Sequence, residues 1–472
     1  MSDRDRLPRW SAAAALIGLL AFPLWLSPTA SASPALGAPP SEVPGRPDSA
    51  VPFAAIDDQL LDTIREILAG RGPGFPVGPG LYRLHGTEPD LPYDDLEPLR
   101  FLLRDATFVG LGESIHTSGG FYEMKHRLFR FLVEEMGFRA FGFESPWVAA
   151  EAARAYVATC NGSSLEALRS LFSVWQSTQT QALLEWMCQW NQAHPGDPVH
   201  FYGFDIQNFA AQNTTPLLEF LARLGHGEGD PLVEGIQVCD GAETSYYPDR
   251  LYPPDLYQQC QAALTATEEL FDEDEKEIVG ASSRHGLAWA RVHLVSAQSW
   301  QEEIFYIDTD FSRGYAARDR GMAYVVAAIR DLRFPRERVA LWAHNGHIMK
   351  HGLSTNAALR TMGTFLDEAW GRRYASVALA AFETFLEWPW IDFCGGPYNI
   401  FGQNPVERLL EATGESTLLL SFDPPGRATF LNPSTAYSIG DIGGIPSQHH
   451  DALIYLEASP AMDPLFTPTP CP

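Results

Sequence analysis

Acidic side chains and histidines follow four short apolar runs of the sequence, and these two residue types supply most of the general acids and bases of enzymes. Each run is rich in β-branched or aromatic residues and is bounded by turn residues, which predicts a buried strand. The carboxyl ends of parallel strands meet at one edge of a sheet, so we expect the side chains that follow the runs to line a single cleft. In chain order, the runs span 107–111, 138–143, 199–204 and 339–343, and the residues that follow them are Glu113 and His116, then Glu144, then Asp205, then His344 and His347.

His116 is the best candidate for a general base, because Glu113 lies three residues before it and can orient its ring as a carboxylate does in a catalytic triad. A histidine held in this way takes a proton from water, and the resulting hydroxide attacks a carbonyl carbon. His344 follows its strand directly and is therefore expected to be rigidly placed, as an oxyanion donor or a second proton-transfer group must be. In the structural alternative, His344 and His347 only hydrogen-bond the backbone of the turn at 345–346.

A metal-dependent mechanism would use the same residues. The three histidines and a carboxylate can hold a divalent cation such as zinc, whose bound water becomes the nucleophile. The spacing His344-x-x-His347 permits such a site, but the sequence contains neither His-Glu-x-x-His nor Cys-x-x-Cys. We therefore predict catalysis without a metal or other cofactor, and the divalent cation is the alternative.

Other enzyme classes lack their sequence signatures. No Gly-x-Ser-x-Gly or Ser-x-x-Lys pattern marks a serine nucleophile, and no Walker A pattern marks a nucleotide site. Gly110 and Gly112 follow a predicted strand as in a dinucleotide fingerprint, but the third glycine of that fingerprint is missing. The sequence therefore argues against nicotinamide binding.

The elements that position these residues alternate between strand and helix. This alternation predicts an α/β fold with a mainly parallel central sheet flanked by helices. Residues 213–330 show helical patterns without a strand and are predicted to form a helical insertion between two core strands. Within them, 225–254 is predicted to be a long loop, either a lid or a solvated excursion. Further strands are predicted at 375–381, 416–421 and 452–456, and helices at 121–135, 181–193, 284–303, 317–332 and 356–370.

The N-terminus has the three regions of a secretory leader. Basic residues precede an apolar run at 11–26, and small residues follow it as far as Ala32. We predict a leader over 1–32, a Pro/Ala-rich flexible tether over 33–55 and a catalytic domain over 56–472. A membrane anchor is the alternative, but Pro23 interrupts the run and no later run is long enough to span a bilayer. The mature protein is therefore expected to be secreted or periplasmic, without stable membrane insertion.

Charge and cysteine content narrow the partners and the compartment. The chain has 33 basic and 59 acidic residues, a formal net charge of −26, which disfavours nucleic acid and anionic membranes and mainly promotes solubility. We expect a small-molecule ester substrate as the partner, and the sequence leaves the oligomeric state open. All six cysteines lie in the exported part, where an oxidising compartment favours disulfides. Proximity along the sequence favours Cys160 with Cys188 and Cys239 with Cys260.

Five ordered motifs resemble the erythromycin esterase family, and the similarity runs from about residue 95 to the last predicted strand. The motifs span 109–116, 125–138, 143–147, 318–323 and 342–347. The resemblance implies a hydrolase in which His116 activates a water for cleavage of a macrolide lactone, an antibiotic-resistance activity. The family's other site positions are matched here by Glu113, Lys125, Glu144, His344 and His347.

These observations lead to one assignment of the site and three functional hypotheses. The first hypothesis is a metal-free hydrolase of carboxylic esters or lactones, and the second is a metal-dependent hydrolase. The third is a non-catalytic binding protein with the same fold, because Gly120 replaces an acidic residue that is common in the family. The catalytic set is Glu113, His116, Glu144, His344 and His347, and the substrate-binding set is Lys125, Asp205 and Arg318.

Overall fold

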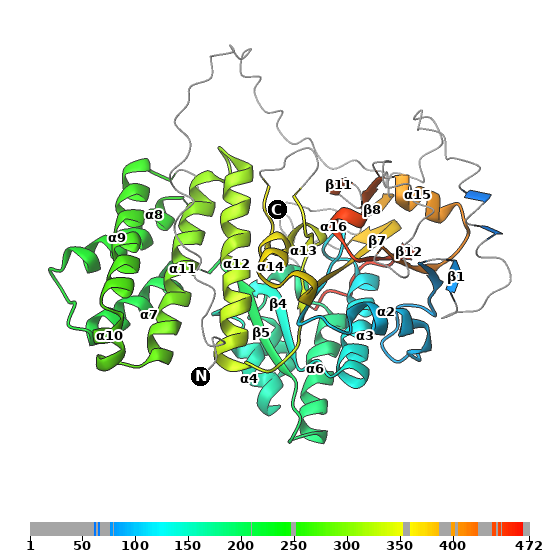
Figure 1. Cartoon of the computed structure of the whole chain (residues 1–472), viewed down its shortest axis with the longest axis horizontal. Helices are drawn as coiled ribbons and strands as arrows, with labels where there is room; N and C mark the ends of the chain where they lie inside the picture. The colour runs from blue at the N-terminus through cyan, green and yellow to red at the C-terminus, as the bar shows by residue number, and fades with distance from the viewer. Residues whose placement is uncertain are drawn as a thin grey trace, which may run out of the picture. The chain divides into compact units, whose positions relative to one another are not determined.

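Helices separate most of the strands along the described part of the chain (Figure 1). The computed structural model describes residues 61–62, 65–66, 76–78, 80–208, 210–246, 252–352, 359–386, 398–401, 405–422, 437–439, 442–444 and 446–465. The strands are β1 (Pro76–Gly78), β2 (Leu81–Arg83), β3 (Phe108–Leu111), β4 (Ala140–Pro146), β5 (His200–Asp205), β6 (Val339–Trp342), β7 (Tyr374–Leu386), β8 (Tyr398–Phe401), β9 (Thr417–Ser421), β10 (Tyr437–Ile439), β11 (Ile442–Gly444) and β12 (Ala452–Ser459). The α-helices are α2 (Glu97–Leu103), α3 (Gly119–Met136), α4 (Glu151–Thr159), α5 (Ser164–Leu168), α6 (Thr178–Ala193), α7 (Ala210–Arg223), α8 (Pro231–Tyr246), α9 (Pro254–Glu273), α10 (Glu275–Ala281), α11 (Arg284–Tyr306), α12 (Phe311–Arg333), α13 (Asn345–Ile348), α14 (Met362–Trp370), α15 (Pro405–Glu411) and α16 (Pro446–His449). Short 3-10 turns lie at η1 (Asp94–Leu96), η2 (Ser173–Trp175) and η3 (Gly371–Arg373).

Within the described residues, ten strands form one sheet, most of it parallel. The strand order is β1-β2-β9-β12-β7-β3-β6-β4-β5, and β8 pairs with β7. From β12 to β5, each strand pairs in parallel with the next strand in this order. Only pairs that involve β1, β2, β8 or β9 are antiparallel in this sheet. A mainly parallel sheet flanked by helices confirms the predicted fold class.

The core strands are apolar along almost their whole length because both faces of the sheet are covered. Aromatic side chains fill one face, and the rings of Phe143 and Trp342 lie 5.0 Å apart between centroids. Parallel strands buried in this way read as continuous apolar runs, which is why the sequence predicts them. In the register, Trp342 pairs with both Leu111 and Phe143, so these three strand ends are level. The residues that follow them therefore meet at one edge.

The chain between β5 and β6 forms a layer of helices. In this layer α12 packs on β5 and on α11, while α7 and α9 pack on α11 and α8 packs on α9 (Figure 1). The predicted loop at 225–254 is wrong over α8, which occupies residues 231–246. A Cβ atom on Gly235 would lie 2.6 Å from the Cβ of Ala263, so this glycine allows close helix packing and does not mark a turn.

The start of α14 also differs from the prediction. A helix was expected over 356–370, but the described residues 359–361 are not helical and α14 begins at Met362. The Thr361 hydroxyl accepts a hydrogen bond from the backbone N–H of Thr364, and the Thr364 side chain bonds back to the backbone of Thr361. This reciprocal cap determines the first turn.

Both predicted disulfides are present in the described chain. Cys160 at the end of α4 is joined to Cys188 on α6, and Cys239 on α8 is joined to Cys260 on α9. Cys394 and Cys471 lie outside the described residues, as do the predicted leader and tether at 1–55. Among the residues that are described, no helix has the length and apolar content needed to cross a membrane.

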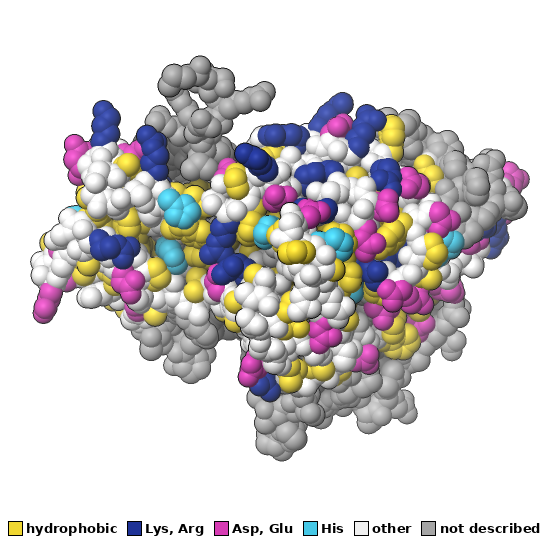
Figure 2. Space-filling model, turned by 90° about the horizontal axis from the view of Figure 1, so that it is seen from below, with side chains coloured by type: hydrophobic (Ala, Val, Ile, Leu, Met, Phe, Trp, Pro, Cys, Tyr) yellow, Lys and Arg dark blue, Asp and Glu magenta, His cyan; other side chains and the backbone are white. Residues whose placement is uncertain are grey.

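Acidic and basic side chains are interspersed on the face of the molecule that Figure 2 shows. Oppositely charged side chains also form partly exposed ion pairs in the described chain, such as Arg139 with Asp197 and Arg100 with Glu135. Neither sign of charge covers the described part of this face in one patch. The acidic surplus is therefore not gathered in one patch on the described part of this face.

Candidate active site

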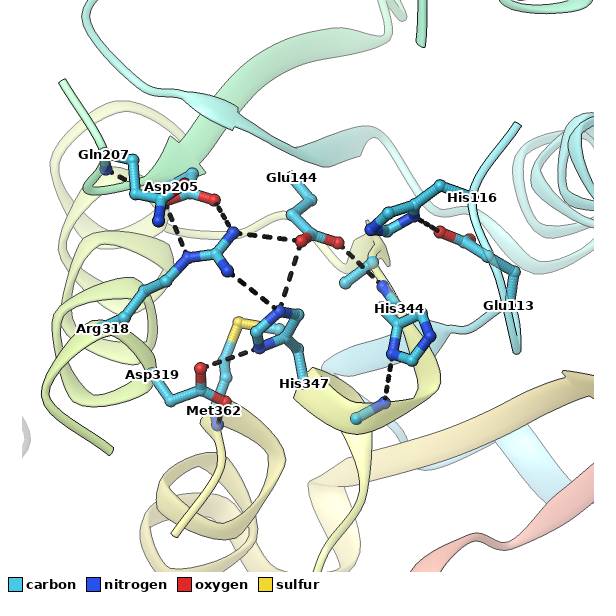
Figure 3. Close-up of polar contacts among 12 residues, drawn as sticks. Glu113, His116, Glu144, Asp205, Gln207, Arg318, Asp319, His344, His347 and Met362 are labelled. Atoms are coloured by element: carbon cyan, nitrogen blue, oxygen red, sulfur yellow. Dashed lines mark hydrogen bonds and ion pairs between the residues drawn. The ribbon is translucent and has the colours of Figure 1, made fainter. Parts of the chain in front are cut away.

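Glu113 orients His116 from the loop that follows β3 (Figure 3). Its Oε1 atom accepts a hydrogen bond of 2.9 Å from Nδ1 of His116. Its Oε2 atom forms an ion pair with Nζ of Lys125, which reaches it from α3. Glu113 and Lys125 are fully buried, whereas 25% of the His116 side chain is exposed. With Nδ1 donating to the carboxylate, Nε2 of His116 carries the lone pair, and no described residue hydrogen-bonds to it.

Burial keeps His116 in its neutral form. Desolvation lowers the pKa of His116 to about 4; Glu144 partly opposes this shift, while the positive charges of His347 and Arg318 add to it. The ring of Trp175 packs edge-on against His116, with 4.8 Å between centroids. A neutral imidazole with a free lone pair is the form that a general base needs at neutral pH.

Glu144, at the end of β4, accepts hydrogen bonds from two other elements. Its Oε2 atom lies 2.8 Å from the backbone nitrogen of His344. Its Oε1 atom lies 3.2 Å from Nη2 of Arg318 on α12 and 3.3 Å from Nε2 of His347 on α13. Burial raises the pKa of Glu144, but the charges of His347 and Arg318, together with the hydrogen bond from His347, outweigh it and hold the pKa well below its ordinary value. Glu144 is therefore a carboxylate that ties β4 to α12 and α13.

His347 lies between two carboxylates. Its Nδ1 atom donates to Oδ1 of Asp319 at 2.7 Å, and Oδ2 of Asp319 accepts a 2.6 Å bond from the backbone N–H of Met362. Burial lowers the pKa of His347, but Asp319 and Glu144 outweigh burial and the charge of Arg318, and raise it to about 10. His347 is thus an imidazolium at neutral pH, and it can donate but not accept a proton.

The raised pKa of His347 predicts a pH-dependent contribution to folding. An unfolded histidine titrates near 6.5, so the charged form stabilises the folded protein fully below about pH 6.5, and this stabilisation is lost as pH rises towards about 10. We expect the difference in unfolding free energy between wild type and His347→Gln to shrink steadily across this window. Urea denaturation at several pH values measures the difference, with the exposed His285→Gln as control. A difference that does not change between pH 6.5 and 10 would contradict the assignment.

His344 hydrogen-bonds the backbone through both ring nitrogens. Its Nε2 atom donates to the carbonyl oxygen of Ser114 at 2.9 Å, and its Nδ1 atom accepts from the backbone N–H of Gly346 at 3.0 Å, which caps α13. Burial lowers the pKa of His344 to about 3. The rigid placement that we expected is present, but the role of oxyanion donor or proton-transfer group is not supported, because neither nitrogen is free. The structural alternative describes His344 better, whereas His347 bonds only side chains through its ring.

Two of the three residues that we expected to bind substrate are fully buried in the structure. Lys125 and Asp205 are fully buried, and each is ion-paired inside the protein, Lys125 with Glu113 and Asp205 with Arg318. Arg318 retains 16% side-chain exposure and is the one of the three that is not fully buried. Direct substrate contact by Lys125 and Asp205 therefore does not fit their burial, and their contacts are those of positioning residues.

Asp319 and Trp175 complete the site, and the sequence analysis missed both. Asp319 is buried within α12 next to Arg318, so a carboxylate on the apolar face of a predicted helix was the signal that could have identified it. Trp175 donates from its indole Nε1 to the carbonyl oxygen of Glu144 at 2.6 Å, besides packing on His116. Nothing local in the sequence marks this tryptophan, because its contacts come from the tertiary fold.

One group of site residues has the spacing of metal ligands. Ligand atoms of Glu113, His116 and Glu144 all lie within 4.8 Å of one another. The expected set of three histidines is not assembled, since both nitrogens of His344 are engaged and His347 is charged. Two carboxylates and one imidazole could hold a divalent cation only in competition with Lys125 and Arg318, which already pair with these carboxylates.

Gly112 allows α13 to approach the loop that carries the base. A Cβ atom at this position would lie 2.0 Å from Oδ1 of Asn345. The Asn345 side chain donates from Nδ2 to the carbonyl oxygen of Leu379 on β7 at 2.8 Å, which anchors α13 to the sheet. The predicted turn at 345–346 is thus the first turn of a short helix, and it brings His347 to Glu144.

Known proteins resemble this chain in sequence. The profile of the family described as Erythromycin esterase matches residues 133–461. Erythromycin esterase type II of Escherichia coli is 25% identical over 321 residues, which cover 62% of this chain and 73% of that protein.

Solved structures resemble it in fold. A Bacillus cereus protein superposes with a TM-score of 0.69 at 19% identity, covering 87% of this chain and 99% of that one. A mutant of erythromycin esterase EreC in its open conformation superposes with a TM-score of 0.65 at 18% identity, covering 80% of this chain and 97% of that one. At these identities the structural likeness shows a shared fold, while the profile covers well over half of the sequence. The chain therefore belongs to the erythromycin esterase family and is a hydrolase.

Proposed function

We propose that the protein is an exported hydrolase of carboxylic esters or lactones in which His116 activates the attacking water. The observation that carries this proposal is the bond from Nδ1 of His116 to Glu113, which leaves the Nε2 lone pair free. In Figure 3 the Nε2 atom of His116 points towards the carboxylate of Glu144. A general base needs this combination of fixed tautomer and open lone pair.

The reaction needs one proton to move twice. Nε2 of His116 takes a proton from water while the water oxygen bonds to the carbonyl carbon, and negative charge develops on the carbonyl oxygen. When the bond from carbon to the alcohol oxygen breaks, the imidazolium returns that proton to the departing alcohol. The cationic groups of Arg318 and His347 lie close enough to His116 to shift its pKa, so they also favour negative charge on an oxyanion formed beside it.

Two further observations support the substrate class and the compartment. The Escherichia coli relative and the solved EreC are both named erythromycin esterases, which makes a macrolide lactone one substrate to test. The two disulfides need an oxidising compartment, and the sequence begins with the pattern of a secretory leader.

A metal-dependent hydrolase is the second candidate, and the close grouping of Glu113, His116 and Glu144 favours it. The local charge balance opposes it. Lys125 pairs with Glu113, and Arg318 and His347 pair with Glu144, so a divalent cation would enter a region where positive groups already compensate the carboxylates. We therefore favour the metal-free mechanism.

We expect the purified mature protein to hydrolyse at least one ester or lactone at an undiminished rate after treatment with a chelator, because the base is an imidazole. The assay is a screen of chromogenic carboxylic esters and macrolide lactones with and without chelator, together with elemental analysis. Stoichiometric zinc, with activity lost on chelation and restored by zinc, would establish the metal-dependent alternative. Binding of these compounds without any turnover would instead favour a non-catalytic protein.

A further inference from the structure

The chain turns back across the loop of the catalytic base after its last strand. The end of β12 and the residues that follow it, 459–465, run antiparallel to this loop, with Ala461 bridged to Ser118. The backbone N–H of Met462 donates to the carbonyl oxygen of Thr117 at 3.0 Å, and the N–H of Gly119 donates to that of Pro460 at 2.7 Å. We call residues 459–465 the C-terminal strap.

The C-terminal strap also binds residues 176–178, the segment that follows Trp175. The N–H of Leu465 donates to the carbonyl oxygen of Gln176 at 3.0 Å, and the N–H of Thr178 donates to that of Asp463 at 2.9 Å. This segment connects η2 to α6. The ring of Trp175, at the end of η2, lies edge-on to the ring of His116. The C-terminal strap thus links the backbone next to His116 to the backbone next to its aromatic neighbour.

Two consecutive glycines let the strap lie against the first turn of α3. A Cβ atom on Gly120 would lie 2.6 Å from Oγ of Ser459 and 2.9 Å from Cδ of Pro460. A Cβ atom on Gly119 would lie 2.7 Å from the carbonyl oxygen of Ala461. Any larger residue at 120 would therefore have to move the strap or the helix.

Thr117, the residue after His116, has a backbone conformation that needs external support. Its φ is +66°, in the left-handed region that β-branched residues rarely adopt. Its N–H donates to the hydroxyl of Tyr122 at 2.8 Å, and its carbonyl oxygen accepts the bond from Met462 of the strap. Such conformations persist only where the surroundings determine them. The strap supplies one of the two backbone contacts that hold Thr117.

We propose that the C-terminal strap is a positioning element for the general base, which holds Thr117 and Trp175 so that His116 stays oriented and desolvated. This inference rests on the proposed role of His116. Displacing the strap should leave the Glu113 and Lys125 pair in place but expose more of the partly buried His116 ring to bulk water. The rate of the chemical step then falls, while substrate binding changes little.

The pH dependence separates this role from a purely structural one. Burial holds the pKa of His116 near about 4, so hydration of its ring should raise the pKa towards the ordinary value. The groups that face His116 stay the same when only the strap moves. They are Glu113 on its own loop, Glu144 on β4, Arg318 on α12, and His344 and His347 at β6 and α13.

The test is Gly120→Ala, with Gly196→Ala as the matched control because a Cβ atom there meets open space. For the ester on which wild type is active, we expect Gly120→Ala to lower kcat by ~10- to 100-fold with little change in KM. Gln179→Ala is a second variant, since the Gln179 side chain bonds both the backbone N–H and the carboxylate of Asp463 at 3.1 Å. Gln179→Ala should also lower kcat, and it tests the role of the strap if Gly120→Ala does not fold.

A measurement without substrate completes the test. Diethyl pyrocarbonate modifies neutral imidazole, so the rate at which His116 is modified, followed by mass spectrometry, reports its protonation. We expect equal rates at pH 5 and pH 7 in wild type, and a clearly slower rate at pH 5 than at pH 7 in the strap variants. Folded strap variants with wild-type kcat and wild-type modification rates would overturn the inference. If His116→Ala is itself fully active, the proposed function fails instead.

Discussion

Replacing His116 with alanine is expected to lower kcat by ~10²-fold or more in a protein that still folds, because the water then lacks its proton acceptor. KM should change little, because a general base acts on the water in the chemical step and not on substrate binding. The acid limb of kcat/KM in wild type gives an independent check. Activity should fall as pH drops towards about 4, where His116 becomes protonated, and not near 6.5 as for an ordinary histidine.

The exposed His285→Ala is the matched control for this experiment, because it removes an imidazole far from the site in the chain. Circular dichroism and thermal unfolding establish that both variants fold. A folded His116→Ala protein that turns over substrate at the wild-type rate would remove His116 from the mechanism. Glu113→Gln should give a smaller loss than His116→Ala, because it weakens the orientation of the base and keeps the base itself.

The second large effect is expected at Lys125, whose replacement by methionine should destabilise the folded protein by about 3–5 kcal/mol. Lys125 and Glu113 form an ion pair with both side chains fully buried, so the variant leaves a buried carboxylate with His116 as its remaining side-chain partner. Burial lowers the pKa of Lys125 well below its ordinary value, and the charge of Glu144 only partly opposes this shift. The ammonium therefore depends on its acidic neighbours.

A double variant isolates this pair. Adding Glu113→Gln to Lys125→Met removes the uncompensated charge and should restore most of the lost stability, although not the activity. Lys276→Met, on an exposed lysine, should stay within about 0.5 kcal/mol of wild type. Urea denaturation of wild type, Lys125→Met, Glu113→Gln and the double variant gives the coupling free energy. Single and double variants of equal stability would show that the pair is not an ion pair in solution.

The bonds of His344 change which histidine we expect to act in the site beside His116. From its place directly after a strand, His344 was expected to be the rigid catalytic partner of His116. It is rigid because Ser114 and Gly346 occupy both of its nitrogens, and the same bonds leave no nitrogen for a substrate. His347, on α13, carries a positive charge and pairs with Glu144 in the site.

The sequence by itself determined the core strands, the order in which they deliver polar residues, and both disulfides of the described chain. Strands covered on both faces must be apolar throughout, and the carboxyl ends of parallel strands must share an edge, so the convergence of His116, Glu144 and His347 follows from local patterns. The disulfides followed from proximity along the chain, because short loops close easily.

Only the tertiary structure decided which polar groups pair and which of them reach the substrate. Lys125 pairs with Glu113, Asp319 with His347, and the strap reaches Thr117 from more than 300 positions along the chain. Such pairings depend on the packing of whole elements, and no spacing encodes them. The same cause explains the wrong loop at 225–254, where Gly235 allows close helix packing. In the sequence, Gly120 is only a departure from the family, and packing shows that its missing side chain admits the strap.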